Sequence, residues 1–102
     1  EVGKYPEDQG FDRNFGGNDL GQPPSYFDPY EPATPTPFSA FDRVTPRDSG
    51  EYLTDREGDE IVDFLQTHAQ KFFIHWAPYA VHTPLMAPQS LQECSVIVFL
   101  NR

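Results

Sequence analysis

The chain has 102 residues, sixteen acidic and seven basic side chains for a net charge of −9, and 37% hydrophobic residues, enough for one small domain with a modest core. The charge argues against a nucleic-acid-binding protein, because neutralising phosphates takes clustered lysine and arginine, and the dispersed acids are typical of a solvated acidic surface. No apolar run approaches the roughly 18 residues of a membrane span.

Residues 1–50 are rich in turn formers. They hold eight of the eleven prolines and show no sustained helical or alternating pattern. Aromatic side chains are nevertheless frequent among these turn formers, whereas disordered segments are usually poor in them. A loop of this length is unusual inside a compact domain, so we expect this segment to pack against other parts of a larger protein.

Residues 51–88 are more regular and begin with a predicted helix over residues 55–68. Thr54 and Glu57 have the spacing of a capping box, in which two side chains satisfy the free amides at a helix start. Ile61, Leu65 and Ala69 then recur at four-residue spacing and predict an apolar face.

The run F-F-I-H-W at residues 72–76 predicts a buried strand. Near-continuous apolar sequence is typical of a strand covered on both faces in a parallel sheet, and Pro78 would end it because proline cannot donate to the ladder. A helix followed by such a strand indicates the α/β class. Residues 96–100 (V-I-V-F-L) could form a second strand, and unpaired they would favour aggregation.

His82 is the candidate functional residue. It lies in the loop Y-A-V-H-T-P at residues 79–84, directly after the predicted strand, and ligands of open α/β sheets bind beyond the carboxyl ends of strands. Its ring could present a nitrogen to an anion, while the alternative is an ordinary surface histidine. His68, His75 and His82 fit no compact metal-ligand spacing, so no histidine metal site is expected.

Three further features have simpler explanations than a functional site. Cys94 is the only cysteine, so it forms no internal disulfide, and beside Glu93 it is expected to be an inert thiol. Gly16-Gly17 lacks the strand and helix of a phosphate loop and predicts a turn. The proline-rich residues 31–37 could be read by a peptide-binding domain, but a stiff connector explains them as well.

Several segments, in order, resemble the formylglycine-dependent sulfatases. Residues 9–12 (Q-G-F-D) with residues 15–17 (F-G-G) resemble the segment after the family's lysine–histidine motif. Residues 50–56 resemble the stretch that opens the helix before a central strand. Residues 72–85 resemble the family's strand and its H-T-P loop, the most specific of the three.

The resemblance implies an α/β/α sandwich of the alkaline-phosphatase type, of which residues 1–102 would be an internal fragment: a loop-rich segment 1–50, a core segment 51–88 and an unassigned tail 89–102. The parent would be a sulfuric ester hydrolase acting on a sulfated small molecule or carbohydrate, with a formylglycine nucleophile and a calcium ion. His82 matches the histidine that contacts the substrate sulfate, where an imidazole can bind sulfate oxygens or stabilise the leaving oxygen. A periplasmic or secreted location would suit the family.

The departures from the family pattern limit these expectations. No C-x-P-x-R or S-x-P-x-R nucleophile motif occurs, and neither the early aspartate pair nor the later Asp-Asn metal pair is present. Gly3-Lys4-Tyr5 is followed by Pro6 where the family has histidine, so no catalytic role is carried to Lys4. The chain alone is therefore expected to be inactive. A phosphate or phosphonate ester hydrolase of the same superfamily, or a non-catalytic acidic, proline-rich interaction module, remains the alternative.

Overall fold

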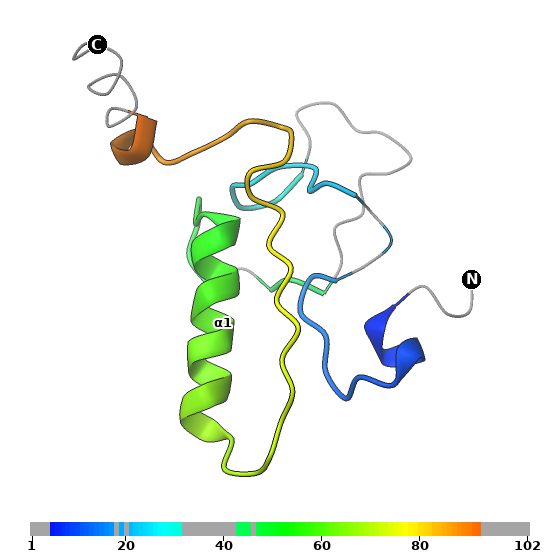
Figure 1. The fold of residues 1–102 in the computed structure, drawn as a ribbon. Helices are drawn as coiled ribbons and strands as arrows, with labels where there is room; N and C mark the ends of the chain where they lie inside the picture. Colours follow the sequence, from blue (N-terminus) through cyan, green and yellow to red (C-terminus); the bar gives the residue numbers. More distant parts are fainter. Residues whose placement is uncertain (1–4, 18, 20, 32–42, 46, 93–102) are drawn as a thin grey trace, which may run out of the picture.

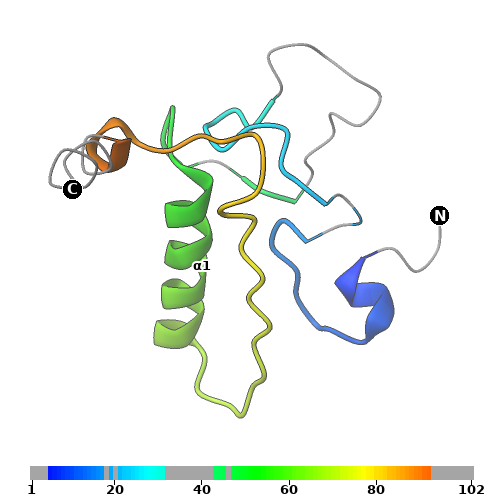
Figure 2. The same cartoon turned by 45° about the horizontal axis from the view of Figure 1, so that its top comes forward.

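The computed structural model describes residues 5–17, 19, 21–31, 43–45 and 47–92. Its elements are a short 3-10 helix, η1 (Pro6–Gln9), and an α-helix, α1 (Leu53–Thr67). An isolated antiparallel bridge joins Phe27 to Tyr52, and residues 89–92 form a helical turn. After α1 the chain turns back and runs beside the helix in extended form (Figures 1 and 2).

Helix α1 confirms the predicted helix, although it starts two residues earlier and ends one residue earlier than expected. Its packed face differs from the predicted one. The most buried positions are Leu53, Arg56 and Glu57, which follow the three- and four-residue spacing of one helix face. Leu65 is 48% exposed, so the apolar stripe predicted from the last turns is only partly used.

The predicted capping box does not form, because the helix begins at a different residue. Tyr52, not Thr54, is the N-cap residue of α1, and the Thr54 hydroxyl is buried without a hydrogen-bond partner in the described part of the chain. The Leu53 amide donates to the Tyr26 carbonyl at 2.8 Å. Pairing with a distant segment therefore sets the helix start, where sequence reasoning looked only at local side chains.

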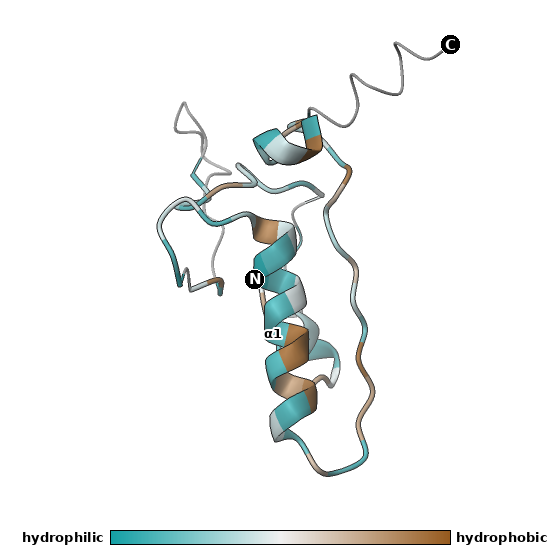
Figure 3. Ribbon diagram, turned by 90° about the vertical axis from the view of Figure 1, so that its left-hand side faces the viewer, coloured by the Kyte–Doolittle hydropathy of each residue, from teal (hydrophilic) through white to brown (hydrophobic). Residues whose placement is uncertain are grey.

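Residues 72–76 do not form the predicted buried strand in this chain. They are extended but belong to no strand among the described residues, and the Phe73 side chain is 77% exposed. A strand needs a neighbouring backbone to complete its ladder, and the described contact of this segment with α1 is between side chains, such as the rings of Phe72 and Phe64. Figure 3 shows its hydrophobic stretches beside those of the helix.

A small aromatic core joins the two halves of the chain. Tyr26, Tyr30 and Leu53 are 1–2% exposed. The side chains packed around these three are partly buried: Phe27, Val44, Tyr52, Tyr79 and Ala80. Residues 26–30 thus pack against the start of α1 within this chain, whereas packing of residues 1–50 on other parts of a larger protein stays a prediction. The Tyr26 and Tyr52 ring centroids are 5.8 Å apart.

Some sequence features lie outside the described residues. These are the possible strand at residues 96–100, Cys94, Lys4 and all but the first residue of the proline-rich segment. Among the described residues, no helix is both long and apolar enough to cross a membrane.

Candidate functional site

The loop that carries His82 is a tight turn at the end of the extended segment. The His82 amide donates to the Tyr79 carbonyl at 2.7 Å, which closes the turn. The His82 side chain is exposed to solvent, whereas Tyr79 and Ala80 before it are partly buried against the aromatic core. The turn therefore projects the imidazole outward from a packed base.

Two hydrogen bonds tie this loop to a segment about sixty residues earlier. The Tyr26 hydroxyl donates to the His82 carbonyl at 3.1 Å, and the Thr83 hydroxyl donates to the Gln22 side-chain oxygen at 3.0 Å. These segments lie side by side in both Figures 1 and 2. The first half of the chain thus holds the histidine loop directly.

A second pair of contacts holds the loop where it continues past His82. The Tyr52 hydroxyl donates to the Met86 carbonyl at 3.4 Å, and the Ser25 hydroxyl lies 3.9 Å from the Met86 sulfur. The contacts at His82, Thr83 and Met86 restrict the backbone from which the His82 side chain projects, together with the packing of Tyr79 and Ala80 against the aromatic core before it.

Burial keeps the anchoring tyrosine neutral. Removal from water raises the pKa of the Tyr26 hydroxyl, and the nearby Tyr52 acts in the same direction, because both effects disfavour the phenolate. Burial likewise raises the pKa of Tyr79 at the base of the turn. The Tyr26 hydroxyl therefore remains an O–H donor to the loop across the physiological pH range.

The imidazole itself is oriented by its neighbour in the chain. His82 Nδ1 lies 3.1 Å from the Thr83 carbonyl oxygen and 3.2 Å from the Thr83 hydroxyl oxygen. Both contacts of the ring are made by Nδ1, so the edge that carries Nε2 is the one turned away from them. An imidazole held by one nitrogen can offer the other to a ligand.

A groove of about 920 Å³ lies below this loop, between α1, the extended segment and residues 6–17. Its walls are largely aromatic and aliphatic, with Phe64, Phe72 and Trp76 among the lining side chains. Glu57 also lines the groove; it is 9% exposed, and its Oε2 atom has no hydrogen-bond partner in the described part of the chain.

Glu57 is electrostatically unusual for a surface helix. Burial raises the pKa of its carboxyl group to about 7, and a hydrogen bond with Trp76 opposes that shift only in part. A carboxylate without a compensating cation is costly in an apolar setting, so the neutral acid is favoured. Sequence reasoning assigned Glu57 to a helix cap and missed this environment.

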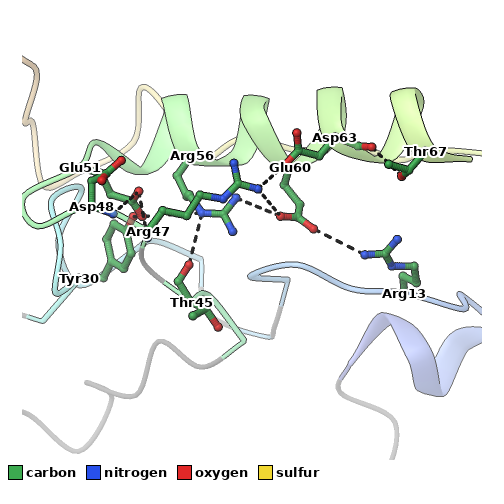
Figure 4. A network of polar contacts seen from close by, with 10 residues as sticks. All are labelled: Arg13, Tyr30, Thr45, Arg47, Asp48, Glu51, Arg56, Glu60, Asp63 and Thr67. Carbon is green, nitrogen blue, oxygen red and sulfur yellow. Dashed lines mark hydrogen bonds and ion pairs between the residues drawn. The ribbon is translucent and has the colours of Figure 1, made fainter.

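An arginine–carboxylate network runs along α1 beside the groove, which Glu60 and Phe15 also line (Figure 4). Arg56 is 6% exposed and contacts Glu60 at 3.0 Å and Glu51 at 3.8 Å. Its Nε donates to the Thr45 carbonyl at 3.3 Å, and its guanidinium lies 4.5 Å from the centre of the Phe15 ring. This buried cation therefore has an acidic, a backbone and an aromatic partner.

Glu51 links that network to the aromatic core. The Tyr30 hydroxyl donates to Glu51 at 2.5 Å, and the amides of Arg47 and Asp48 donate to its other oxygen. Burial acts to raise the pKa of Glu51, but these hydrogen bonds outweigh it and leave the pKa lowered. Arg56 and Glu51 are both paired with groups of this chain, so we assign the network a structural role.

The three histidines, whose spacing predicts no shared metal site, have different surroundings. His68 stacks on Phe64 with 4.6 Å between ring centroids, and no three His, Cys, Asp or Glu side chains among the described residues could hold a metal ion. These residues do not fit the calcium site implied for the sulfatases, so no chemical step is assigned to a metal here.

Gly16 and Gly17 form a turn, as their sequence context indicated. The Asn14 side chain accepts from the Gly17 amide at 2.9 Å and donates to the Gly17 carbonyl at 2.6 Å. A Cβ on Gly17 would meet the Asn14 side-chain oxygen at 2.6 Å. The amide that a phosphate loop would offer to a ligand is thus already used.

Comparison with known proteins gives one finding. A family model described as Sulfatase matches residues 1–99, nearly the whole chain and including the histidine loop. Searches of curated proteins and of solved structures gave no significant match.

Proposed function

Because the chain belongs to the sulfatase family, whose members are sulfatase-type hydrolases with an α/β fold and sulfate-ester substrates, we propose that it is part of a formylglycine-dependent sulfatase in which His82 contacts the substrate sulfate. The remainder of the α/β/α sandwich, the nucleophile and the calcium ligands are supplied by residues outside this sequence. The missing nucleophile motif, and the lack of a metal-ligand cluster among the described residues, support this part of the proposal.

The observation that carries the proposal is an exposed imidazole on a loop held at both sides. His82 is solvent-exposed, yet its carbonyl accepts from the buried Tyr26 and the chain beyond it is held at Met86. An exposed side chain on a restrained backbone favours anion binding, because little conformational entropy is lost when the ligand binds. A protonated ring donates an N–H to a sulfate oxygen, which can only accept.

In the complete enzyme the role of His82 is to bind and orient. Its N–H would hold a sulfate oxygen while the bond to the leaving oxygen breaks, and it could pass a proton to that leaving oxygen. The substrate is a sulfated small molecule or carbohydrate.

The direct test uses the chain with sodium sulfate as the probe. The ring resonances of the three histidines are followed by NMR at about pH 6 while sulfate replaces chloride at constant ionic strength. We expect the His82 resonances to shift saturably, while those of His68 and His75, which serve as internal controls, change little. Equal shifts at all three rings would show only nonspecific screening and would contradict the assignment of His82.

A turnover assay tests the second half of the proposal. The purified chain should not hydrolyse 4-nitrophenyl sulfate, because it contains no nucleophile motif. Turnover that is lost with His82→Ala would mean that this chain holds a complete catalytic centre and would overturn that half. Repeating the ring titration with phosphate distinguishes the phosphatase alternative, for which phosphate would shift His82 more than sulfate does.

A further inference from the structure

The contacts around His82 determine which of its nitrogens carries a hydrogen. A backbone carbonyl can only accept a hydrogen bond. His82 Nδ1 lies 3.1 Å from the Thr83 carbonyl oxygen, so this contact is a hydrogen bond only when Nδ1 bears the hydrogen. In a neutral ring the lone pair is then on Nε2.

The Thr83 hydroxyl also favours a hydrogen on His82 Nδ1, because its own hydrogen is donated to another side chain. That hydroxyl donates to the Gln22 side-chain oxygen at 3.0 Å, and a hydroxyl has only one hydrogen to give. Toward His82 Nδ1, 3.2 Å away, its oxygen can therefore only accept. Gln22 thus prevents Thr83 from donating to the ring.

We propose that Gln22 and Thr83 are positioning residues that fix His82 as the Nδ1–H tautomer and keep Nε2 as the nitrogen that faces the sulfate. This inference rests on the proposed function for its purpose only, since the tautomer is a property of the chain without any anion. Because sulfate oxygens only accept, the ring contacts them through Nε2–H, and that hydrogen is present in the imidazolium form.

Among the described residues, no titratable side chain bonds to the His82 ring, so its tautomer depends on Thr83 and Gln22. In the part of the chain that the structure describes, Tyr26 and Tyr52 are the titratable side chains whose hydrogen bonds reach this loop, through the carbonyls of His82 and Met86. Burial raises the pKa of Tyr26 and of Tyr79, which lies within the loop. Tyr26 and Tyr79 are therefore neutral near neutral pH. The Tyr26 hydroxyl is bound to the His82 backbone, not to its ring.

The test is the ring tautomer, read from the ¹⁵N chemical shifts of the imidazole. Spectra at about pH 8.5, where an ordinary imidazole is neutral, should show His82 mainly as the Nδ1–H form. Histidine side chains in water favour the opposite tautomer, so the exposed His75 serves as the reference in the same spectrum. A His82 signal in the Nε2–H form would overturn the proposal directly.

Paired substitutions separate positioning from mere stability. In Gln22→Ala the Thr83 hydroxyl is free to donate to Nδ1, so we expect the Nδ1–H to Nε2–H ratio to fall by about 2- to 10-fold, the equivalent of one hydrogen bond. Gln22→Glu keeps an acceptor and should preserve the ratio. An unchanged ratio in Gln22→Ala, or an equal fall in both variants, would contradict the role of Gln22.

A second pair tests the hydroxyl itself. Thr83→Ser retains the hydroxyl and should keep the wild-type ratio, whereas Thr83→Val should lower it. Thr67→Val is a matched control, because the Thr67 hydroxyl donates only to backbone carbonyls of α1. Failure of the sulfate titration with a confirmed Nδ1–H tautomer would refute the proposed function and leave this inference standing.

Discussion

Two aromatic regions of this chain behave differently. Around Tyr26 and Tyr30 the rings are buried, and their hydroxyl groups bond to the His82 loop and to Glu51. Along residues 72–76 the aromatic rings of Phe72, Phe73 and Trp76 are about half or more exposed. The two phenylalanines meet other rings, those of Phe64 and Phe11, and Trp76 bonds to the Glu57 side chain. The comparison teaches that aromatic content alone does not make a core. The polar groups that tie rings to a distant backbone determine which segment is held.

The largest effect should come from removing the ring that anchors the loop. Tyr26→Ala leaves a cavity in the small core, which should lower the free energy of unfolding by about 3–4 kcal/mol. Tyr26→Phe removes only the hydroxyl and should cost about 1 kcal/mol. Phe73→Ala, at a 77% exposed position, should change stability by less than about 0.5 kcal/mol.

Denaturant unfolding of these variants checks the contrast. Similar losses in the free energy of unfolding for Tyr26→Ala and Phe73→Ala would mean that the two aromatic regions are equally packed, contrary to this prediction.

The buried arginine should matter more than its exposed neighbour. Arg56→Met removes the buried cation that Glu51 and Glu60 share, at a cost of about 2–4 kcal/mol. Arg47 pairs with Glu60 and Asp63 at the surface, so Arg47→Met should cost less than about 1 kcal/mol. Unfolding curves that place Arg47→Met below Arg56→Met in stability would contradict the account of the network.

Glu57 should make the groove sensitive to pH. Its pKa is about 7 in the folded chain against 4.5 as the ordinary value, so the folded state binds the proton more tightly. Its stabilising contribution is complete below pH 4.5 and is lost as the pH rises to about 7. The loss should amount to about 1–3 kcal/mol, since the groove is open to water.

Thermal unfolding at pH 5 and pH 8 measures this contribution. Glu57→Gln should be relatively more stable than wild type at pH 8 and similar to it at pH 5, whereas Asp59→Asn, at an exposed position of the same helix, should show no such difference. If the difference in stability between wild type and Glu57→Gln is the same at both pH values, the pKa of Glu57 is not raised by burial and this prediction is wrong.

The smallest effect on stability, but a visible one on solubility, is expected at residues 72–76. An extended apolar segment with an open edge favours association between chains. Phe72→Ser with Phe73→Ser should reduce aggregation in light scattering. Leu85→Ser, at a position outside this segment that is 82% exposed, is the control and should leave aggregation unchanged. Equal improvement from both would show that total exposed apolar area matters, not this segment.

The sequence predicted the local features better than the long-range ones. The helix, the turn at Gly16-Gly17 and the exposed histidine loop each depend on residues close together in the chain. The start of α1 and the anchoring of His82 depend on Tyr26, which no spacing rule connects to a residue 56 positions later. Residues 72–76 have a strand-like composition, but a ladder requires a second backbone that their own composition does not provide.

Amide hydrogen exchange tests the central claim, that the His82 loop is held within this chain while residues 72–76 are not. The amides of Leu53 and His82 donate to the carbonyls of Tyr26 and Tyr79, so we expect them to exchange at least about tenfold more slowly than those of Phe73 and Ile74. Tyr26→Phe should reduce the protection of His82 without changing that of Phe73. If the His82 amide exchanges as fast as those of Phe73 and Ile74, the loop is not anchored and the account is wrong.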